Sequence, residues 1–253
     1  MSGSRLVTLD GFALLGVRVP TIKPVPASNR LLAALPRKER EHLLVVCKTI
    51  DLVSGEVLAE SGERIHQVYF PTSGIIYRLT PIKDHTNLEV GLISDEGMLG
   101  ASLILGVNSS PLRSVVLSSG LALCMSAATF RRELELNPAL NRLLKRYLYV
   151  VKSQLAQTAV CSLYHLVEAR LARLLLMVQD RTHLDKIHVT HELLAQMLGV
   201  RRVGVTKAAV SLRNNNLIRY SRGDIAILDR SGLEAASCSC YKADNETYTR
   251  IMG

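Results

Sequence analysis

The residues with the clearest chemical character in this chain are six cations near its C-terminal end. They lie between Gly199 and residue 222, in a stretch without aspartate or glutamate: Arg201, Arg202, Lys207, Arg213, Arg219 and Arg222. An ordinary solvated helix face mixes both signs of charge, whereas a cluster of one sign repels itself unless a polyanion offsets it. The cluster therefore predicts contacts with the phosphates of a nucleic acid.

Cysteine is the second residue type that could carry chemistry. The chain has five cysteines: Cys47, Cys124, Cys161, Cys238 and Cys240. This odd, sparse set argues against the disulfide framework of a secreted protein. Cys238 and Cys240 could bind a metal together with a histidine, or form a redox switch, but a Cys-x-Cys pair alone lacks the four-ligand spacing of a zinc site. We therefore predict two reduced thiols and no metal.

Catalytic motifs are missing from the sequence. It contains no Walker-type phosphate loop, no GxSxG elbow and no HExxH pair. His183, His188 and His191 lie close together, but His191 stands at the start of a predicted helix, where a phosphate contact is more natural than metal ligation. We predict neither a catalytic residue nor an enzymatic activity.

The cations belong to a predicted pair of short helices. Thr190 is a good N-cap for a helix over 191–198, and Gly199 supplies the left-handed residue that ends it. A second helix is predicted over 202–214. Its apolar side faces inward and carries Val205, Ala208, Ala209 and Leu212. Its other side faces outward and carries Arg202, Val203, Thr206, Lys207, Val210 and Asn214.

A helix, a glycine turn and a second helix with an exposed basic end are typical of a helix-turn-helix. The following residues 219–227 alternate at period two around a glycine turn, which predicts a hairpin, or wing, with Arg222 at its tip. The pattern as a whole predicts a winged helix that binds DNA. The predicted DNA contacts are Thr190, His191, Arg201, Arg202, Val203, Thr206, Lys207, Arg213 and Arg222.

Upstream, residues 49–130 contain short alternating runs separated by glycine turns, which is typical of a sandwich, barrel or β-roll. Asn137-Pro138 then begins a long predicted helix. Its apolar stripe recurs at steps of four and three: Leu140, Leu144, Tyr147, Val151, Gln154 and Thr158. Such a stripe packs either on the β-domain or on a second helix, and the polar Gln154 and Thr158 favour a dimer interface.

Composition limits the class of protein. The 253 residues are 48% hydrophobic, enough for a folded core, and carry a formal net charge of +9 with a pI near 9.5. Such a charge favours an anionic partner, either nucleic acid or an acidic membrane surface. We find no clean signal peptide, and Ser118-Ser119-Gly120 interrupts the longest uncharged run, so we predict a cytoplasmic protein without a membrane span.

The segment Thr190-His191-Glu192-Leu193-Leu194-Ala195-Gln196-Met197-Leu198-Gly199-Val200-Arg201-Arg202-Val203-Gly204-Val205-Thr206-Lys207 resembles the signature of the Crp/Fnr family of transcription regulators. The resemblance covers about residues 30–230. It implies that Arg202 reads bases and that Lys207 is a second basic contact. The family often has a glutamate where Val203 stands. A carboxylate accepts a hydrogen bond from cytosine, whereas valine meets only a thymine methyl, so the half-site should differ from the usual one.

The resemblance also implies an α+β fold, with a cyclic-nucleotide-binding-like β-roll, a dimerisation helix and a winged helix-turn-helix. The predicted parts are a flexible N-terminal arm (1–28), a β-roll sensor (29–136), the dimerisation helix (137–161), the winged domain (162–232) and a C-terminal tail (233–253).

In this family the β-roll often holds a cyclic nucleotide through a Gly-Glu pair and an Arg-Ser or Arg-Thr pair. The matching residues here are Gly100, Ala101, Arg113 and Ser114. Ala101 stands where the glutamate would hold the ribose, and the spacing to Arg113 is longer than in the family. We expect a degenerate pocket, a different effector or no effector rather than a cyclic nucleotide.

Two functions from different classes are open at this point. The first is a homodimeric regulator that binds double-stranded DNA at a pseudo-palindromic operator, with RNA polymerase as a further expected partner. The second is a small-molecule-sensing module that acts through a protein partner. The stretch without acidic residues at 199–222 favours the first.

Overall fold

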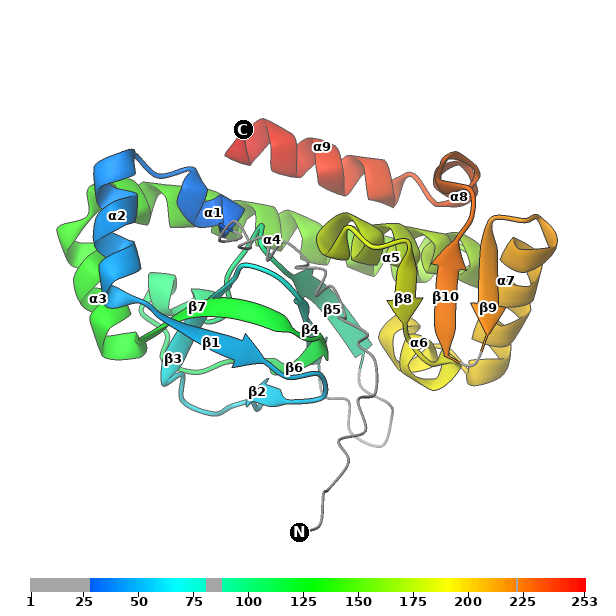
Figure 1. Ribbon diagram of the computed structural model, residues 1–253, viewed down its shortest axis with the longest axis horizontal. Helices are drawn as coiled ribbons and strands as arrows, with labels where there is room; N and C mark the ends of the chain where they lie inside the picture. The colour runs from blue at the N-terminus through cyan, green and yellow to red at the C-terminus, as the bar shows by residue number, and fades with distance from the viewer. Residues whose placement is uncertain (1–27, 81–87, 222) are drawn as a thin grey trace, which may run out of the picture.

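A long helix joins a strand-rich part of the molecule to a smaller helical part (Figure 1). The computed structural model describes residues 28–80, 88–221 and 223–253. The predicted N-terminal arm, except for its last residue, lies outside these ranges. Two helices come first, α1 (Arg30–Ala33) and α2 (Arg37–Val46). Asn29 caps α1, because its side chain accepts a hydrogen bond of 3.0 Å from the Leu32 backbone nitrogen.

The strands form two antiparallel sheets, in the orders β1-β7-β3 and β2-β6-β4-β5. Their bounds are β1 (Lys48–Leu52), β2 (Val57–Ala59), β3 (Gln67–Pro71), β4 (Ile75–Thr80), β5 (Leu88–Ile93), β6 (Arg113–Ser118) and β7 (Gly120–Ser126). Apolar side chains from both sheets meet in a shared core that includes Leu52, Ile76, Ile93, Val116 and Ala122. The predicted β-roll is confirmed.

Helices cover the roll. A 3₁₀ helix, η1 (Ala101–Leu105), lies between β5 and β6, and α3 (Ala127–Leu136) follows β7. The sequence analysis did not predict α3, which Ser126 caps by accepting from the backbone of Thr129. The long helix α4 (Pro138–Tyr164) begins after Asn137, whose side chain accepts a hydrogen bond of 2.9 Å from the Leu140 nitrogen.

The stripe predicted for dimerisation packs within the chain. Leu140, Leu144 and Tyr147 are buried in the core beneath α2, α3 and the roll. Gln154 and Thr158 line a cavity of about 40 Å³ against β5 and the following helix α5. The N-terminal part of the stripe therefore packs on the β-domain, one of the two interpretations that the same periodicity allows, and a dimer contact through Gln154 and Thr158 stays a prediction.

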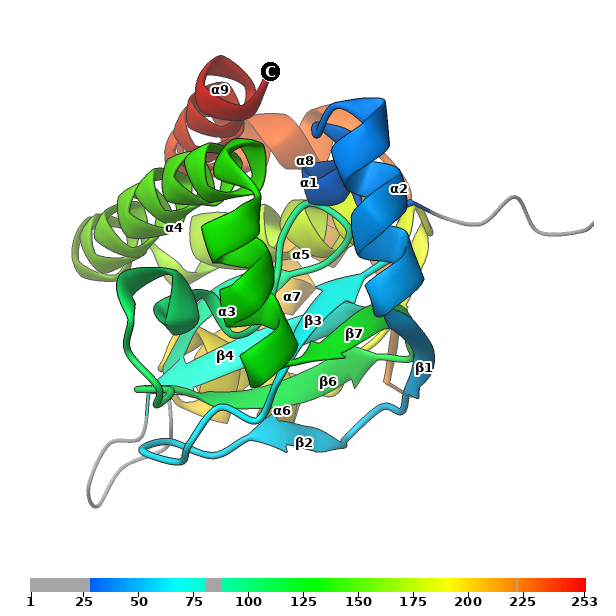
Figure 2. The same cartoon turned by 90° about the vertical axis from the view of Figure 1, so that its left-hand side faces the viewer.

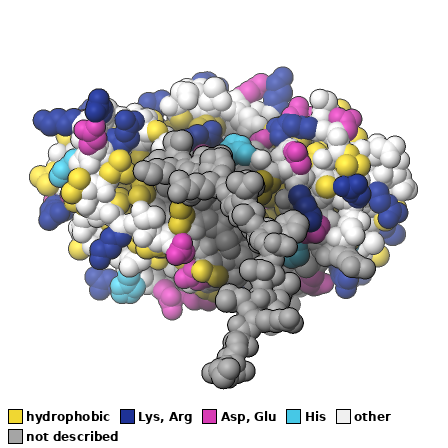
Figure 3. Space-filling view, in the orientation of Figure 1, with side chains coloured by type: hydrophobic (Ala, Val, Ile, Leu, Met, Phe, Trp, Pro, Cys, Tyr) yellow, Lys and Arg dark blue, Asp and Glu magenta, His cyan; other side chains and the backbone are white. Residues whose placement is uncertain are grey.

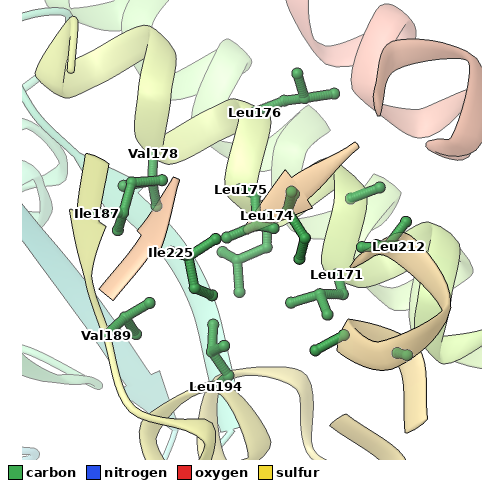
Figure 4. Packing of buried hydrophobic residues seen from close by; sticks show 14 of the residues in the cluster. Leu171, Leu174, Leu175, Leu176, Val178, Ile187, Val189, Leu194, Leu212 and Ile225 are labelled. Atoms are coloured by element: carbon green, nitrogen blue, oxygen red, sulfur yellow. The ribbon is translucent and has the colours of Figure 1, made fainter. Parts of the chain in front are cut away.

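The C-terminal part is built around α5 (Val167–Thr182). It continues through β8 (Lys186–His188), α6 (His191–Leu198), α7 (Arg202–Asn214), β9 (Ile218–Ser221) and β10 (Asp224–Ile227). The three strands form an antiparallel sheet in the order β8-β10-β9. Leucines of α5 point into one core with Leu194 of α6, Leu212 of α7 and Ile225 of β10 (Figure 4). The α+β class with a winged C-terminal domain is thus confirmed.

The last residues form helices rather than the predicted tail. Helix α8 (Arg230–Ala236) is capped by Asp229 and buries Leu233 in the core around α5. Helix α9 (Cys240–Met252) lies alongside α4 in both ribbon views (Figure 2). Met252 joins the buried cluster of α1 to α4. Among the described residues, we find no helix long and apolar enough to cross a membrane.

Candidate nucleic-acid interface

Helix α6 is set by its two ends. At its start, Thr190 Oγ1 accepts a hydrogen bond of 3.1 Å from the Leu193 nitrogen, which satisfies one of the free N–H groups of the first turn. At its end, Gly199 has a φ of +62°, the left-handed conformation that stops a helix and turns the chain. Leu194, Met197 and Leu198 are buried and hold α6 against α5 and α7. The predicted first helix and its turn are confirmed.

Gly199→Ala is expected to destabilise the protein by about 1–2 kcal/mol from the left-handed backbone, and the added Cβ would lie 2.7 Å from Leu88 Cδ1, so the end of this side chain must also shift. Gly106→Ala is the matched control, since Gly106 also has a positive φ (+77°) but no atom near the added Cβ. Urea denaturation should rank Gly199→Ala as the less stable variant. Equal midpoints would show that Leu88 does not constrain the turn.

Helix α7 presents two different faces. Val205, Ala208, Ala209 and Leu212 are buried, as the sequence predicts. The small alanines allow α6 and α7 to pack closely. The opposite face is exposed or half-buried and carries Arg202, Val203, Thr206, Lys207, Val210 and Asn214. Val203 is 59% exposed, so this apolar side chain is available to a partner surface.

The cations form an unpaired basic surface, which we define as Arg201, Arg202, Lys207, Arg213 and Arg219. All five side chains are exposed, and within the described residues none of them forms an ion pair. Lys and Arg side chains gather at the end of the molecule where α7 and β9 lie (Figure 3). The structure thus brings together five of the six cations in the acid-free stretch. The sixth, Arg222, lies outside the described residues.

The wing is an antiparallel hairpin of β9 and β10, with Gly223 at φ +88° in its turn. Asp224 is held by Lys186 and His188 of β8, at 2.8 Å in each case. Hydrogen bonds from these two residues lower the pKa of Asp224. The negative charge of the Asp224 carboxylate is therefore offset by its partners in the sheet, so this residue adds little negative charge to the basic surface.

His191 makes contacts within the protein that the sequence did not predict. Its ring stacks on Tyr220 with centroids 4.2 Å apart, and its Nδ1 lies 3.2 Å from Thr206 Oγ1. Its Nε2 is buried. Burial, together with the charge of Arg202, lowers the pKa of His191. His191 therefore links α6, α7 and β9 through the Tyr220 ring and Thr206, while its Nε2 has no hydrogen-bond partner among the described residues, and its contact with DNA stays a prediction.

The β-roll contains a cavity of about 310 Å³. Gly100, Ala101 and Ser114 line it, whereas Arg113 is outside and pairs with Glu60 at 3.2 Å. Successive residues of a strand point to opposite faces, so Arg113 and Ser114 of β6 cannot both face the cavity. Arg113 therefore does not line this cavity, and its assignment to an effector site stays a prediction that this geometry does not support.

Two cations that were not predicted, Arg64 and Arg78, do line this cavity. Arg78 of β4 stands opposite Ser114 in the sheet, and its Nε is buried without a hydrogen-bond partner in the described structure. The same is true of Ser114 Oγ. Only the pairing of β4 with β6 reveals that Arg78 and Ser114 are neighbours, because the two residues are far apart in the sequence.

Buried charges join the roll to the C-terminal part. Glu96 and Arg181 of α5 form an ion pair of 2.8 Å, with side chains only 9% and 11% exposed. Nearby, burial raises the pKa of Glu89 to about 7, although Arg173, Arg78, Arg181 and the Gly91 backbone act in the opposite direction. Glu89 lines the small cavity between β5, α4 and α5.

Glu89→Gln is expected to change how stability depends on pH. The folded-state pKa of about 7 lies above the ordinary 4.5, so folding takes up a proton and wild-type stability falls as pH rises from about 4.5 to 7. The variant should lack this fall, which amounts to at most about 3 kcal/mol. Urea denaturation at a series of pH values measures it, with the exposed Glu41→Gln as control. Identical pH profiles for Glu89→Gln and wild type would disprove the assignment.

Known proteins share parts of this arrangement. Residues 169–236 match the family model described as a Crp-like helix-turn-helix domain. Three solved structures are similar to this chain over most of their length. FixK2 from Bradyrhizobium japonicum has a TM-score of 0.66 at 13% identity and covers 76% of this chain and 98% of its own. The chain has a Crp-like helix-turn-helix domain within the Crp/Fnr fold.

Two further structures share the Crp/Fnr fold. The c-di-GMP-responsive global regulator CLP of Xanthomonas campestris has a TM-score of 0.64 at 13% identity, over 77% of this chain and 100% of its own. The CRP-family transcriptional regulator TTHB099 of Thermus thermophilus has a TM-score of 0.63 at 17% identity, over 74% and 96%. No curated protein matches the sequence.

Proposed function

We propose that this protein is a sequence-specific DNA-binding transcription regulator that acts as a homodimer on a pseudo-palindromic operator. The observation that carries the proposal is the unpaired basic surface around α7. Arg202 stands at the first position of α7 and Lys207 lies further along its exposed face. The N-terminal residues of a recognition helix contact base edges in the major groove, while neighbouring cations hold phosphates. A DNA-binding regulator works in the compartment that holds the DNA, so we propose that this protein is cytoplasmic.

The homodimer is supported by a free apolar face on α4. The exposed residues Tyr149, Ala156, Val160 and Leu163 of this helix are spaced at seven, four and three residues, and Tyr149 also lines a shallow pocket with Arg250 and Ile251 of α9. Leu163 is 79% exposed and Tyr149 is 54% exposed. Large apolar side chains in a helical stripe are stabilised when they pack on a second helix. We therefore place the proposed dimer interface on these exposed residues.

The roll cavity supports control by a small effector. Its volume of about 310 Å³ lies within the usual range of ligand pockets, and α4 contributes Leu148, Val151 and Leu155 to its wall. A ligand there would touch both the roll and the helix that we assign to dimerisation. Arg78 and Ser114 offer hydrogen-bond donors to an anionic or carbonyl-bearing group. Since Ala101 cannot hold a ribose hydroxyl, a cyclic mononucleotide is not the effector that this pocket favours.

Selection of bound duplexes from random DNA, with and without small-molecule cell extract, tests the proposed function. We expect enriched sequences to be inverted repeats with half-sites about 34 Å apart, one turn of the duplex. Light scattering of the complex should give two chains of 27.8 kDa per duplex. Lack of enrichment under both conditions would contradict the proposal and favour a regulator that acts through a protein partner.

A further inference from the structure

Four side chains that suit a metal converge at the junction between α4 and the winged domain. Cys161 lies in the last turn of α4, and His165 is the residue that caps this helix. Cys238 lies between α8 and α9, and Cys240 is the first residue of α9. The three cysteine Sγ atoms and one ring nitrogen of His165 all lie within 4.8 Å of one another.

The distances match tetrahedral coordination. Cys161 Sγ lies 3.5 Å from Cys238 Sγ, and Cys240 Sγ lies 3.4 Å from His165 Nδ1. Zinc bonds of about 2.3 Å to sulfur and 2.0–2.1 Å to nitrogen place tetrahedral ligand atoms roughly 3.5–3.8 Å apart. Cys161 and His165 are four residues apart, so they share one face of the helix end. The Cys-x-Cys turn supplies the other two ligands from the opposite side.

The surroundings suit thiolates rather than inert buried thiols. The Gln157 side-chain amide donates a hydrogen bond of 2.9 Å to Cys240 Sγ, as groups around a metal commonly do to its ligands. Arg170 and Arg173 lie close enough to Cys161 and Cys238 for their charges to interact. Arg173 is also paired with the buried Asp244 at 2.5 Å, so Arg170 is the guanidinium group that offsets the single net negative charge that three thiolates and one histidine leave around a divalent ion.

Two simpler explanations account for less of this arrangement. Buried cysteines can be small apolar core residues, but then His165 and Gln157 would have no reason to point at the same sulfur. A disulfide between Cys161 and Cys238 would use two of the four groups and leave Cys240 and His165 without a role. Reduced thiols are also the normal state inside a cell.

We propose that Cys161, His165, Cys238 and Cys240 bind one zinc ion per chain in a closed, structural site. Binding replaces the three thiol protons, which are released to solvent, and uses a neutral imidazole. Four protein ligands complete the tetrahedron and leave no position for substrate, so the ion has no catalytic part. No oxidation or reduction is involved.

The site would tie together segments that are distant in the sequence. Cys161 and Cys238 are 77 residues apart, and both C-terminal cysteines lie beyond residues 169–236, the part that matches the Crp-like domain. Zinc would fix the start of α9 beside the end of α4, next to the link between α4 and α5. It would thereby hold the winged domain at a set angle to the long helix. This inference does not depend on the proposed DNA binding.

The test uses the full chain, prepared metal-free with a chelator and kept reduced. We expect it to bind one Zn²⁺ per chain, and Co²⁺ in its place should give the thiolate charge-transfer bands and intense d–d absorption of tetrahedral coordination. Cys238→Ser should weaken Zn²⁺ affinity at least about 100-fold, and Gln157→Leu about 10-fold. Cys47→Ser is the matched control, because Cys47 lies outside the cluster, and it should bind as tightly as wild type.

Three results would overturn the proposal. These are Co²⁺ spectra of the wild type without thiolate bands, equal Zn²⁺ affinity for Cys238→Ser and Cys47→Ser, and a Cys161–Cys238 disulfide in protein whose thiols are alkylated at lysis. The wild-type Co²⁺ spectrum needs no variant. It therefore decides the question even if Cys238→Ser does not fold.

Discussion

Replacing both Arg202 and Lys207 by alanine is expected to weaken binding to the selected operator at least about 100-fold. Each side chain is exposed on α7 and has no ion-pair partner among the described residues, so its removal leaves no unsatisfied group in the protein. Each base-reading contact contributes about 1–3 kcal/mol to the free energy of binding. Because the contact exists only in the complex, its removal weakens DNA binding and leaves the free protein unchanged. Fluorescence anisotropy with a labelled operator measures the change.

The single variants Arg202→Ala and Lys207→Ala should also differ in how they change the sequence preference of binding. Arg202→Ala should relax the preference at one base pair of each half-site, whereas a cation that contacts phosphates weakens binding to all sequences alike. Lys38→Ala is the matched control, since Lys38 is exposed on α2, far from α7 in the sequence, and should leave affinity unchanged. Thermal unfolding should be the same in all these variants. Wild-type affinity in the double variant would show that α7 is not the recognition helix.

Arg181→Met is expected to destabilise the protein by about 3–5 kcal/mol, the largest effect on stability that we predict. The change leaves the Glu96 carboxylate buried without its cation, and the cost of an uncompensated buried charge exceeds that of losing the pair as a whole. The variant also loses the hydrogen bond from Arg181 to the Met177 carbonyl. Urea denaturation measures the difference.

Two controls separate the ion pair from other effects. Adding Glu96→Gln to Arg181→Met should recover part of the lost stability, because the buried charge is then removed. Arg37→Met breaks the exposed ion pair with Glu41, whose side chains are 84% and 58% exposed, and should cost less than about 1 kcal/mol. If the double variant is no more stable than Arg181→Met, Glu96 does not carry a buried charge.

Local features of the winged domain could be predicted from the sequence. Thr190 as a cap, Gly199 as a left-handed turn and the inward face from Val205 to Leu212 all follow from rules that reach over a few residues. The hairpin of β9 and β10 follows from alternation and a glycine turn. These predictions were right because the physical cause and its effect lie within one or two turns of chain.

Features that depend on distant segments could not be predicted in this way. Periodicity identified a stripe on α4 but not its partner, which is the same chain around Leu144. Arg78 was not predicted as a cavity residue because only strand pairing puts it beside Ser114. Helix α9 and the Cys161 cluster depend on contacts across about 80 residues, for which a single sequence offers no signal.

The most direct test of the central claim is the salt dependence of binding by the full chain to the selected operator and to a scrambled duplex of the same length. If the basic surface holds phosphates, log K for the operator should fall linearly with log[salt], with a slope of about −0.9 for each phosphate contacted. Five described cations per chain, doubled in a dimer, predict a steep slope. We also expect the operator to bind more tightly than the scrambled duplex at every salt concentration. A flat salt response, or equal affinity for the two duplexes, would contradict the account.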